Sequence, residues 1–300
     1  SNLRISQDLS LITKGLNMSA MFAYDVYSFE SLTQSKREST YYFADRENPY
    51  DENNQPILTR TYEGSTALSY SNSSNGNKKT YVEASLNYDR AFEKHRIGAL
   101  LLYNQQNKLI YPQNLLEDAL PYRSRGYAGR VTYSWDDRYF VEFNVGYNGA
   151  ENFARENRYG LFPAMGLGWV VSNEKFWESV RPVISFLKIR YTDGKVGNSN
   201  VGDRRFMYLA QYTYDNNYGY YLGRTDQKTT GVRVVNDAVN LIWESSQKQD
   251  IGIDFKLFND ELSVIVDLFK EHRTNILLKR DQSIPNFLGN MSEPYGNVGV

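Results

Sequence analysis

Residues 129–147 decide the fold: they read GRVTYSWDDRYFVEFNVGY, and apolar and polar side chains alternate on both sides of the Asp-Asp pair. Before the pair, every second residue from Val131 to Trp135 is apolar, and after it the same holds from Tyr139 to Tyr147. A period of two places apolar side chains on one face of a β-strand and polar ones on the other. The stretch therefore predicts two antiparallel strands joined by a tight turn at the two aspartates.

The same alternation recurs along most of the chain and predicts ten strands in all. They are expected at residues 3–11, 16–29, 80–88, 97–103, 131–135, 139–147, 159–171, 187–191, 251–257 and 262–268. One short helix is expected over Glu174–Val180, with Ser172 or Asn173 as its N-cap. The chain is thus predicted to be almost entirely β.

The connections between these strands alternate in length. Short turns are expected at residues 13–15, 89–95, 136–137, 172–182 and 259–261. Long polar loops are expected at residues 30–79, 105–126, 148–158 and 193–248. Short turns at one end and long loops at the other are typical of an outer-membrane β-barrel.

Aromatic residues lie at both ends of the predicted strands, as in the two interfacial girdles of a membrane barrel. Tyr88, Trp135 and Trp169 lie near the short turns, and Tyr103, Tyr147 and Tyr159 lie near the long loops. The expected fold class is all-β, an antiparallel up-and-down transmembrane β-barrel segment of about ten to twelve strands. A soluble β-sandwich whose core face starts and stops on tyrosine is the alternative that periodicity leaves open.

Composition excludes several classes of protein. Aromatic residues make up 15% of the 300 residues, which excludes a chain that is disordered throughout. The longest apolar run, Ile97–Tyr103, is far too short for a transmembrane helix. Lys and Arg number 34 against 35 Asp and Glu, with no basic stripe, so nucleic acid is not an expected partner.

Catalytic and metal-binding residue types are scarce. Cysteine is absent and only His95 and His272 supply imidazoles, which leaves almost no material for a metal centre, thiol chemistry or a Ser-His-Asp triad. No pair of carboxylates is singled out by spacing for acid–base catalysis. We therefore expect no enzyme, no metal and no cofactor.

Several stretches resemble one known family, and together they cover nearly the whole chain. They are RYGLFPAMGLGWVVSNEKFW at 158–177, within a similar segment that begins at Gly129, LKIRYTDGKVGN at 187–198, LIWESSQKQDIGIDFKLFNDELSVIVDLFKEHRTNILL at 241–278, and IPNFLGN and YGNVG near the end. These stretches are similar to the SusC/RagA-like TonB-dependent outer-membrane transporters of Bacteroidetes. Asp193 departs from the family pattern, which usually has an aromatic residue just before the glycine.

The resemblance implies both an architecture and a function. Family members are similar to 22-stranded barrels with a plug inside, so residues 1–300 are expected to be an internal part of one barrel domain, without the plug, TonB box or last strands. The implied function is TonB-dependent import of oligosaccharides or peptides into the periplasm, across the outer membrane of a Gram-negative cell, together with a SusD-like surface lipoprotein. The alternatives are a passive porin and a soluble carbohydrate-binding module.

Two sets of candidate site residues follow. A glycan site combines exposed rings with amides, and the loop Asp215–Gly223 offers Asn216, Asn217, Tyr218, Tyr220 and Tyr221. The alternative is that these rings pack on neighbouring loops or on the lipoprotein.

The second set consists of charged residues on the strand faces opposite the apolar ones, which are expected to point into the barrel lumen. They are Arg130, Glu142, Lys188, Arg190, Asp250, Asp254 and Lys256. Such charges can either guide solute or hold a plug by ion pairs.

Overall fold

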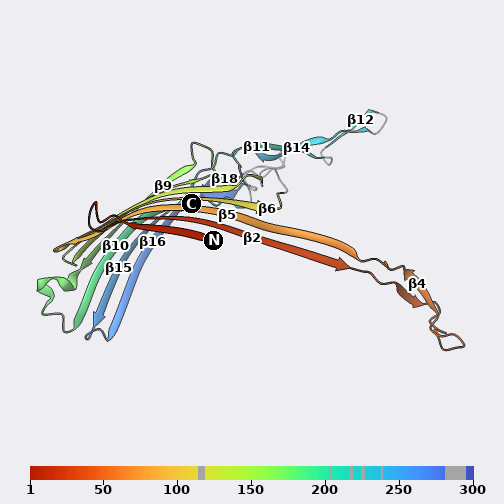
Figure 1. Cartoon of the computed structure of the whole chain (residues 1–300), viewed down its shortest axis with the longest axis horizontal. Coiled ribbons are helices and arrows are strands. Elements are labelled where there is room, and N and C mark those ends of the chain that lie inside the picture. The colour runs from red at the N-terminus through yellow and green to blue at the C-terminus, as the bar shows by residue number, and fades with distance from the viewer. Residues whose placement is uncertain (114–118, 203–204, 216–218, 224–226, 238, 281–294) are drawn as a thin grey trace. The chain divides into compact units, whose positions relative to one another are not determined.

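Ten strands of the described chain form one antiparallel sheet in which each strand pairs with the next sheet strand along the chain (Figure 1). The computed structural model describes residues 1–113, 119–202, 205–215, 219–223, 227–237, 239–280 and 295–300. The spatial order is β1-β2-β5-β6-β7-β8-β9-β10-β15-β16. The predicted antiparallel meander of ten strands is confirmed.

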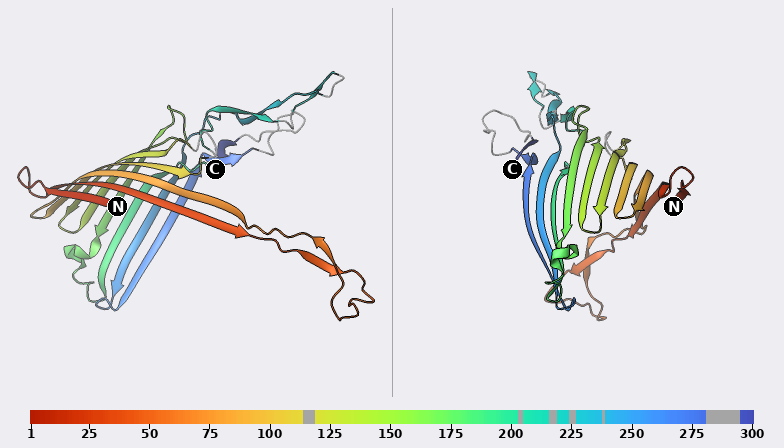
Figure 2. Two further views of the ribbon diagram at one scale, coloured as in Figure 1. Left: turned by 45° about the vertical axis from the view of Figure 1, so that its right-hand side comes forward. Right: turned by 90° about the vertical axis from the view of Figure 1, so that its left-hand side faces the viewer.

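Eight of the ten sheet strands are longer than the sequence pattern suggested, whereas β1 and β9 are slightly shorter. The sheet twists and curves as it runs from β1 to β16 (Figure 2). Their bounds are β1 Asn2–Asp8, β2 Leu16–Ser35, β5 Ser69–Phe92, β6 His95–Tyr111, β7 Tyr122–Trp135, β8 Tyr139–Ala150, β9 Tyr159–Val170, β10 Ile184–Asn198, β15 Glu244–Leu257 and β16 Leu262–Thr274.

Shorter strands form separate two-stranded hairpins within the connections. The pairs are β3 (Thr40–Phe43) with β4 (Leu58–Tyr62), β11 (Ala210–Asp215) with β14 (Gly231–Asp237), β12 (Tyr221–Leu222) with β13 (Gln227–Lys228), and β17 (Ile276–Lys279) with β18 (Tyr295–Gly299). The long connections are therefore structured in part.

The chain divides into two compact units. The larger comprises residues 1–25, 79–108 and 120–300 and contains most of the sheet. The smaller comprises residues 26–78 and 109–119. Within the smaller unit the Arg37 guanidinium lies 3.8 Å from the centroid of the Tyr62 ring, and the Ser35 and Ser69 hydroxyls are 2.7 Å apart.

The Asp136-Asp137 turn explains why the hairpin signal was so clear. Both residues have φ of 51°, and the Arg138 amide donates to the Trp135 carbonyl at 2.9 Å. Positive φ at both central positions is the type I′ geometry that matches the twist of a hairpin, and aspartate tolerates it better than most residues.

The helix predicted over Glu174–Val180 is wrong. Two short 3-10 turns stand there instead, η2 (Val171–Asn173) and η3 (Lys175–Trp177). Neither has a side-chain cap, because the Asn173 amide donates to the Asp137 carbonyl and the Glu174 carboxylate binds side chains of β8 and β9. Contacts to the neighbouring hairpin therefore replace a helix that was at most two turns long.

The expected loop at residues 30–79 is also largely wrong. β2 continues to Ser35 and β5 begins at Ser69, so much of the segment is strand, with β3 and β4 between. The run Ser69–Lys79 is almost entirely polar and carries no alternation, so its strand conformation rests on backbone pairing with β2.

The two faces of the sheet differ in chemistry and in burial. The predicted apolar face carries exposed large side chains, with Val131 at 52%, Phe143 at 51% and Leu167 at 47% exposure. On the opposite face of β8 and β10, Glu142, Lys188 and their neighbours are half-buried, the crowding expected inside a curved sheet. No helix among the described residues is long and apolar enough to span a membrane.

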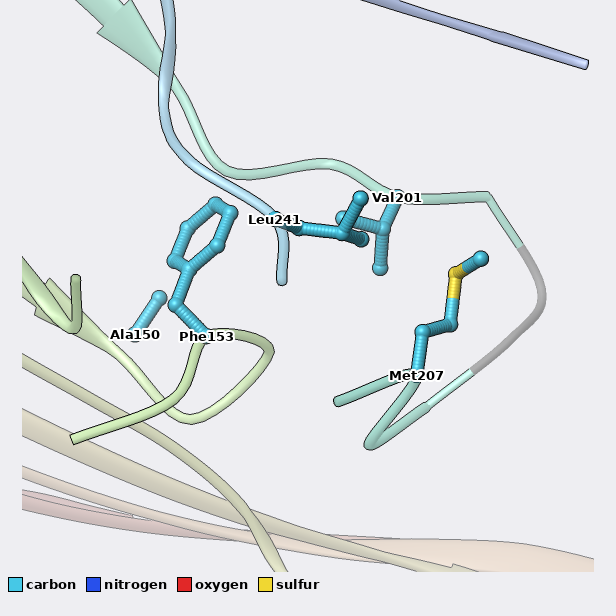
Figure 3. Close-up of a cluster of buried hydrophobic side chains, with 5 residues drawn as sticks. All are labelled: Ala150, Phe153, Val201, Met207 and Leu241. Atoms are coloured by element: carbon cyan, nitrogen blue, oxygen red, sulfur yellow. The ribbon is translucent and has the colours of Figure 1, made fainter. Parts of the chain in front are cut away.

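A compact apolar cluster, here called the loop core, forms where the long connections meet (Figure 3). Its members are Ala150, Phe153, Val201, Met207 and Leu241, with Val239, Trp243, Leu277 and Tyr295 packed against it. Phe153, Met207 and Leu241 are among the most deeply buried large side chains of the described chain. The loop end of the sheet thus has a core of its own.

Candidate functional site

Rings on the apolar face form two ladders that cross several strands. Near the loops, ring centroids are 5.2 Å apart for Tyr103 and Tyr127, 6.4 Å for Tyr127 and Tyr147, and 4.9 Å for Tyr147 and Tyr159. This upper ladder runs across β6, β7, β8 and β9. The sequence pattern had indicated all of its members except Tyr127.

A lower ladder lies near the short turns. The Trp135 and Tyr139 rings are 5.7 Å apart, and Tyr139 and Trp169 are 6.3 Å apart with nearly parallel planes. Tyr139 and Tyr147 are eight residues apart on β8, about 26 Å along the strand. At the ~40° tilt usual for such strands this separates the ladders by about 20 Å, comparable with the apolar band of a membrane barrel.

The Glu174 carboxylate ties the polar edges of the lower ladder together. It accepts hydrogen bonds from the Tyr139 hydroxyl at 2.8 Å and the Trp169 indole at 3.3 Å, and it pairs with the Arg138 guanidinium at 3.3 Å. The hydrogen bond from Tyr139, supported by Trp169 and Arg138, lowers the pKa of the Glu174 carboxyl below its ordinary value. The sequence offered no sign of this role, because Glu174 fitted the first turn of the expected helix.

We expect the Glu174 carboxylate to stabilise the folded barrel at pH values above its folded-state pKa and not below it. Because that pKa is lowered, the contacts contribute fully above about pH 4.5 and are lost as the pH falls through the lower folded value. Glu174→Gln should therefore lose its folded, fast-migrating band at a lower temperature than wild type near pH 7. The difference should close as the pH falls below about 4.5 and through the lowered folded-state pKa of Glu174. Glu178→Gln, in the same turn, is the control, and a difference that persists at low pH would contradict the assignment.

Arg190 is the centre of a charge cluster on the polar face. Its guanidinium lies 3.2 Å from Asp250 Oδ1, 3.3 Å from Asp254 Oδ1, and in contact with the Asp267 carboxylate. One cation among three carboxylates leaves a local charge of −2. The sequence pattern placed Arg190, Asp250 and Asp254 on this face, but Asp267 was missed.

A glycine makes room for this arrangement. Arg190 and Asp267 are the register partners of Gly252 on either side. A Cβ atom at Gly252 would stand 2.4 Å from the Arg190 guanidinium carbon, so any side chain there would require the guanidinium to shift. The guanidinium therefore lies across bare backbone and reaches the carboxylates of two strands.

Two of the other charged residues predicted for this face, Glu142 and Lys188, line an open cleft of about 450 Å³ together with Arg190. Glu142 accepts a hydrogen bond from the Asn144 amide at 2.7 Å, and the Lys188 ammonium is 5.7 Å from the Phe140 ring centroid.

The remaining two lie away from that cleft. Arg130 is exposed and aligned with Asn144. Lys256 pairs with Asp260 at 3.3 Å. All seven residues thus occupy the polar face, although only three of them join the Arg190 cluster.

The candidate ligand residues are only partly described. Asn216, Asn217 and Tyr218 lie outside the described residues. Tyr220 and Tyr221 are 64% and 63% exposed, and the Lys228 ammonium lies 5.8 Å from the Tyr221 ring centroid.

Two further tyrosines on β11, Tyr212 and Tyr214, are exposed to 67% and 81%. They alternate with polar residues, a strand signal that sequence reasoning had passed over within a long loop. Within the described ranges, no group of three or more His, Asp and Glu side chains could hold a metal ion.

One apolar face bounded by two aromatic ladders, backed by a charged face, is the construction of an outer-membrane β-barrel wall. No protein-family model matches the chain. It is 33% identical over 176 residues to the TonB-dependent receptor SusC of Bacteroides thetaiotaomicron, covering 57% of this chain and 17% of that protein. It is 26% identical over 262 residues to TonB-dependent receptor P3 of Formosa agariphila, covering 79% of this chain and 25% of that protein.

Solved structures show the same fold. The RagAB peptide transporter matches with a TM-score of 0.70 and 18% identity, over 99% of this chain and 32% of that one. The siderophore receptor PirA of Acinetobacter baumannii matches with a TM-score of 0.50 and 9% identity, over 93% of this chain and 35% of that one. The chain thus spans about a third or less of these proteins.

The chain is similar to the SusC/RagA-like TonB-dependent receptors, and its sheet matches part of such a barrel in fold. Such receptors lie in the outer membrane of Gram-negative bacteria, which confirms the predicted localisation.

Proposed function

We propose that this chain forms part of the wall of a TonB-dependent importer of oligosaccharides or peptides. The observation that carries the proposal is the two-faced sheet, with the ladders and apolar side chains on one face and the Arg190 cluster on the other. One face suits lipid and the other suits an aqueous, charged interior. Kinship with SusC and likeness in fold to the RagAB peptide transporter support the same function.

The Arg190 cluster suits a role in holding a plug inside the barrel. Its local charge of −2 leaves carboxylate oxygens available to a cationic group, and the side chains are already 25–42% exposed rather than sealed in. A passing solute would meet the same charges, so guiding solute is the second role that the geometry allows.

The exposed tyrosines of the hairpins suit the mouth of the importer. Tyr212, Tyr214, Tyr220 and Tyr221 present rings that can stack on sugar faces or peptide side chains. We propose that the connection between β10 and β15 contacts the ligand or a SusD-like lipoprotein, since long loops with their own aromatic clusters are usually functional.

The test uses uptake by cells that carry the intact receptor. Tyr220→Ala/Tyr221→Ala should lower uptake of the cognate glycan or peptide about tenfold, the size expected for losing two ring contacts. Tyr220→Phe/Tyr221→Phe keeps the rings and should retain most uptake. Wild-type uptake and partner binding by a folded alanine variant would remove this hairpin from the site.

The energy source separates the proposed importer from a porin. Uptake through an importer should stop when TonB is deleted, whereas a porin conducts solute down its gradient without it. Uptake that persists without TonB would replace the transporter assignment with a passive channel.

A further inference from the structure

A small basic pocket, here called the rim pocket, lies at the loop end of β7 and β8. Its volume is about 220 Å³, and its lining includes Arg123, Arg125, Arg158, Glu151 and Tyr159. Three arginines and one glutamate are thus among the lining residues. The charge of the lining is therefore +2, on a chain whose net charge is −1.

The existing contacts leave this positive charge largely uncompensated. Arg123 pairs with Glu151 at 3.5 Å, a distance at the long end for an ion pair. Arg125 donates to the Gln105 side-chain oxygen at 3.3 Å, and that oxygen also accepts from the Tyr103 hydroxyl at 2.8 Å. The Arg158 Nε is shielded from solvent and has no hydrogen-bond partner among the described residues.

The pocket adjoins the upper ladder on the apolar side of the wall. Arg125 and Arg123 follow the alternation of Tyr127 and Val131, so they lie on the same face of β7, while Arg130 lies on the other. Arg125 is two residues beyond Tyr127, about 7 Å along the strand. Tyr159 belongs to both the ladder and the pocket lining.

The turn end of the same face is built differently. There the lower ladder meets Arg138, Glu174, Asp136 and Lys94, whose pairs join two cations to two carboxylates and leave no net charge. An excess of positive charge therefore accompanies the upper ladder at the loop end and does not accompany the lower ladder.

We propose that the rim pocket binds the phosphate of a lipid headgroup in the membrane leaflet that surrounds the loop end of the wall. Girdle rings lie at headgroup level, so groups one or two residues beyond them reach the phosphate layer. Guanidinium groups match phosphate oxygens in pairs and hold them by charge-assisted hydrogen bonds. The inference rests on the membrane-facing side of the wall and is independent of what is transported.

The test compares lipid binding by variants of the intact receptor, measured by native mass spectrometry from a nonionic detergent. The probe is phosphatidic acid, whose headgroup is a bare phosphate monoester, against phosphatidylcholine with the same acyl chains. Arg123→Gln/Arg125→Gln should bind phosphatidic acid about tenfold more weakly than wild type, the size expected for a lost charge-assisted hydrogen bond. Phosphatidylcholine binding should change little.

Arg130→Gln is the matched control, because it removes a cation from the same strand on the opposite face. It should bind phosphatidic acid as wild type does, and a heat-modifiability gel confirms that each variant is a folded barrel. Equal lipid binding by wild type and the double variant would overturn the proposal, as would an equal loss in Arg130→Gln. Displacement of the lipid by inorganic phosphate at matched concentration would also overturn it, by showing a site for free anions.

Discussion

Replacing Phe143 with arginine is expected to lower the free energy of unfolding of the barrel by about 2–4 kcal/mol. Phe143 is four residues from each of Tyr139 and Tyr147, so it lies midway between the two ladders, and it is 51% exposed on the apolar face. Its register partners, Val131 and Met165, are exposed apolar residues as well. A guanidinium there would stand near the bilayer midplane, where its desolvation is most costly.

Glu142→Arg is the matched control, because residue 142 lies on the opposite face of the same strand and lines an open cleft with Lys188 and Arg190. Its effect should be mild. Unfolding of the refolded receptor in lipid vesicles, followed by urea titration, measures both. Spin labels at residues 141, 143 and 145 should be shielded from a water-soluble quencher, and labels at 142 and 144 should be reached. Equal access at all five positions would contradict the assignment of the faces.

The 300-residue chain expressed alone is expected to aggregate or to require detergent. It exposes 21466 Å², whereas a compact monomer of 34.7 kDa exposes about 13,000 Å². Many large apolar side chains are among the exposed ones, and β1 and β16 end the described sheet with strand edges that invite association. Both features disappear only when a membrane covers the face and further strands cover the edges.

Sedimentation in buffer with and without a mild detergent measures this. Aggregates should dominate in buffer alone, and defined particles should form in detergent. A monodisperse, detergent-free monomer would contradict the barrel assignment and favour the soluble carbohydrate-binding module.

The strands could be predicted from sequence wherever one face is apolar. Alternation around Val141 and Phe143 fixed both the strand and its faces, because a shift of one residue would turn every apolar side chain to the other side. The polar run Ser69–Lys79 carries no such pattern, so the extension of β5 was invisible. The helix expected at Glu174 failed because contacts to Arg138 and Tyr139, distant in sequence, decide the local conformation.

The candidate sites show the same division. The face of the sheet on which Arg190 and Asp254 lie could be predicted, because these residues alternate with apolar neighbours. The ion pair between Arg190 and Asp267 could not, because it depends on the register between β15 and β16. The loop core joins Phe153 to Leu241 across nearly ninety residues, and no local pattern announces such a contact. The rim pocket likewise needs β7 and the β8–β9 connection side by side before its charges meet.

The loop core also bears on how such a protein can diversify. Side chains on the wall must suit lipid tails on one side, while Phe153, Met207 and Leu241 are shielded from water by one another. Which substitutions the hairpins tolerate therefore depends on packing against the loop core and not on contact with the bilayer. Because the two sets of constraints are separate, one barrel wall can carry many different loop regions. An engineer could exchange the hairpins while keeping the loop core unchanged.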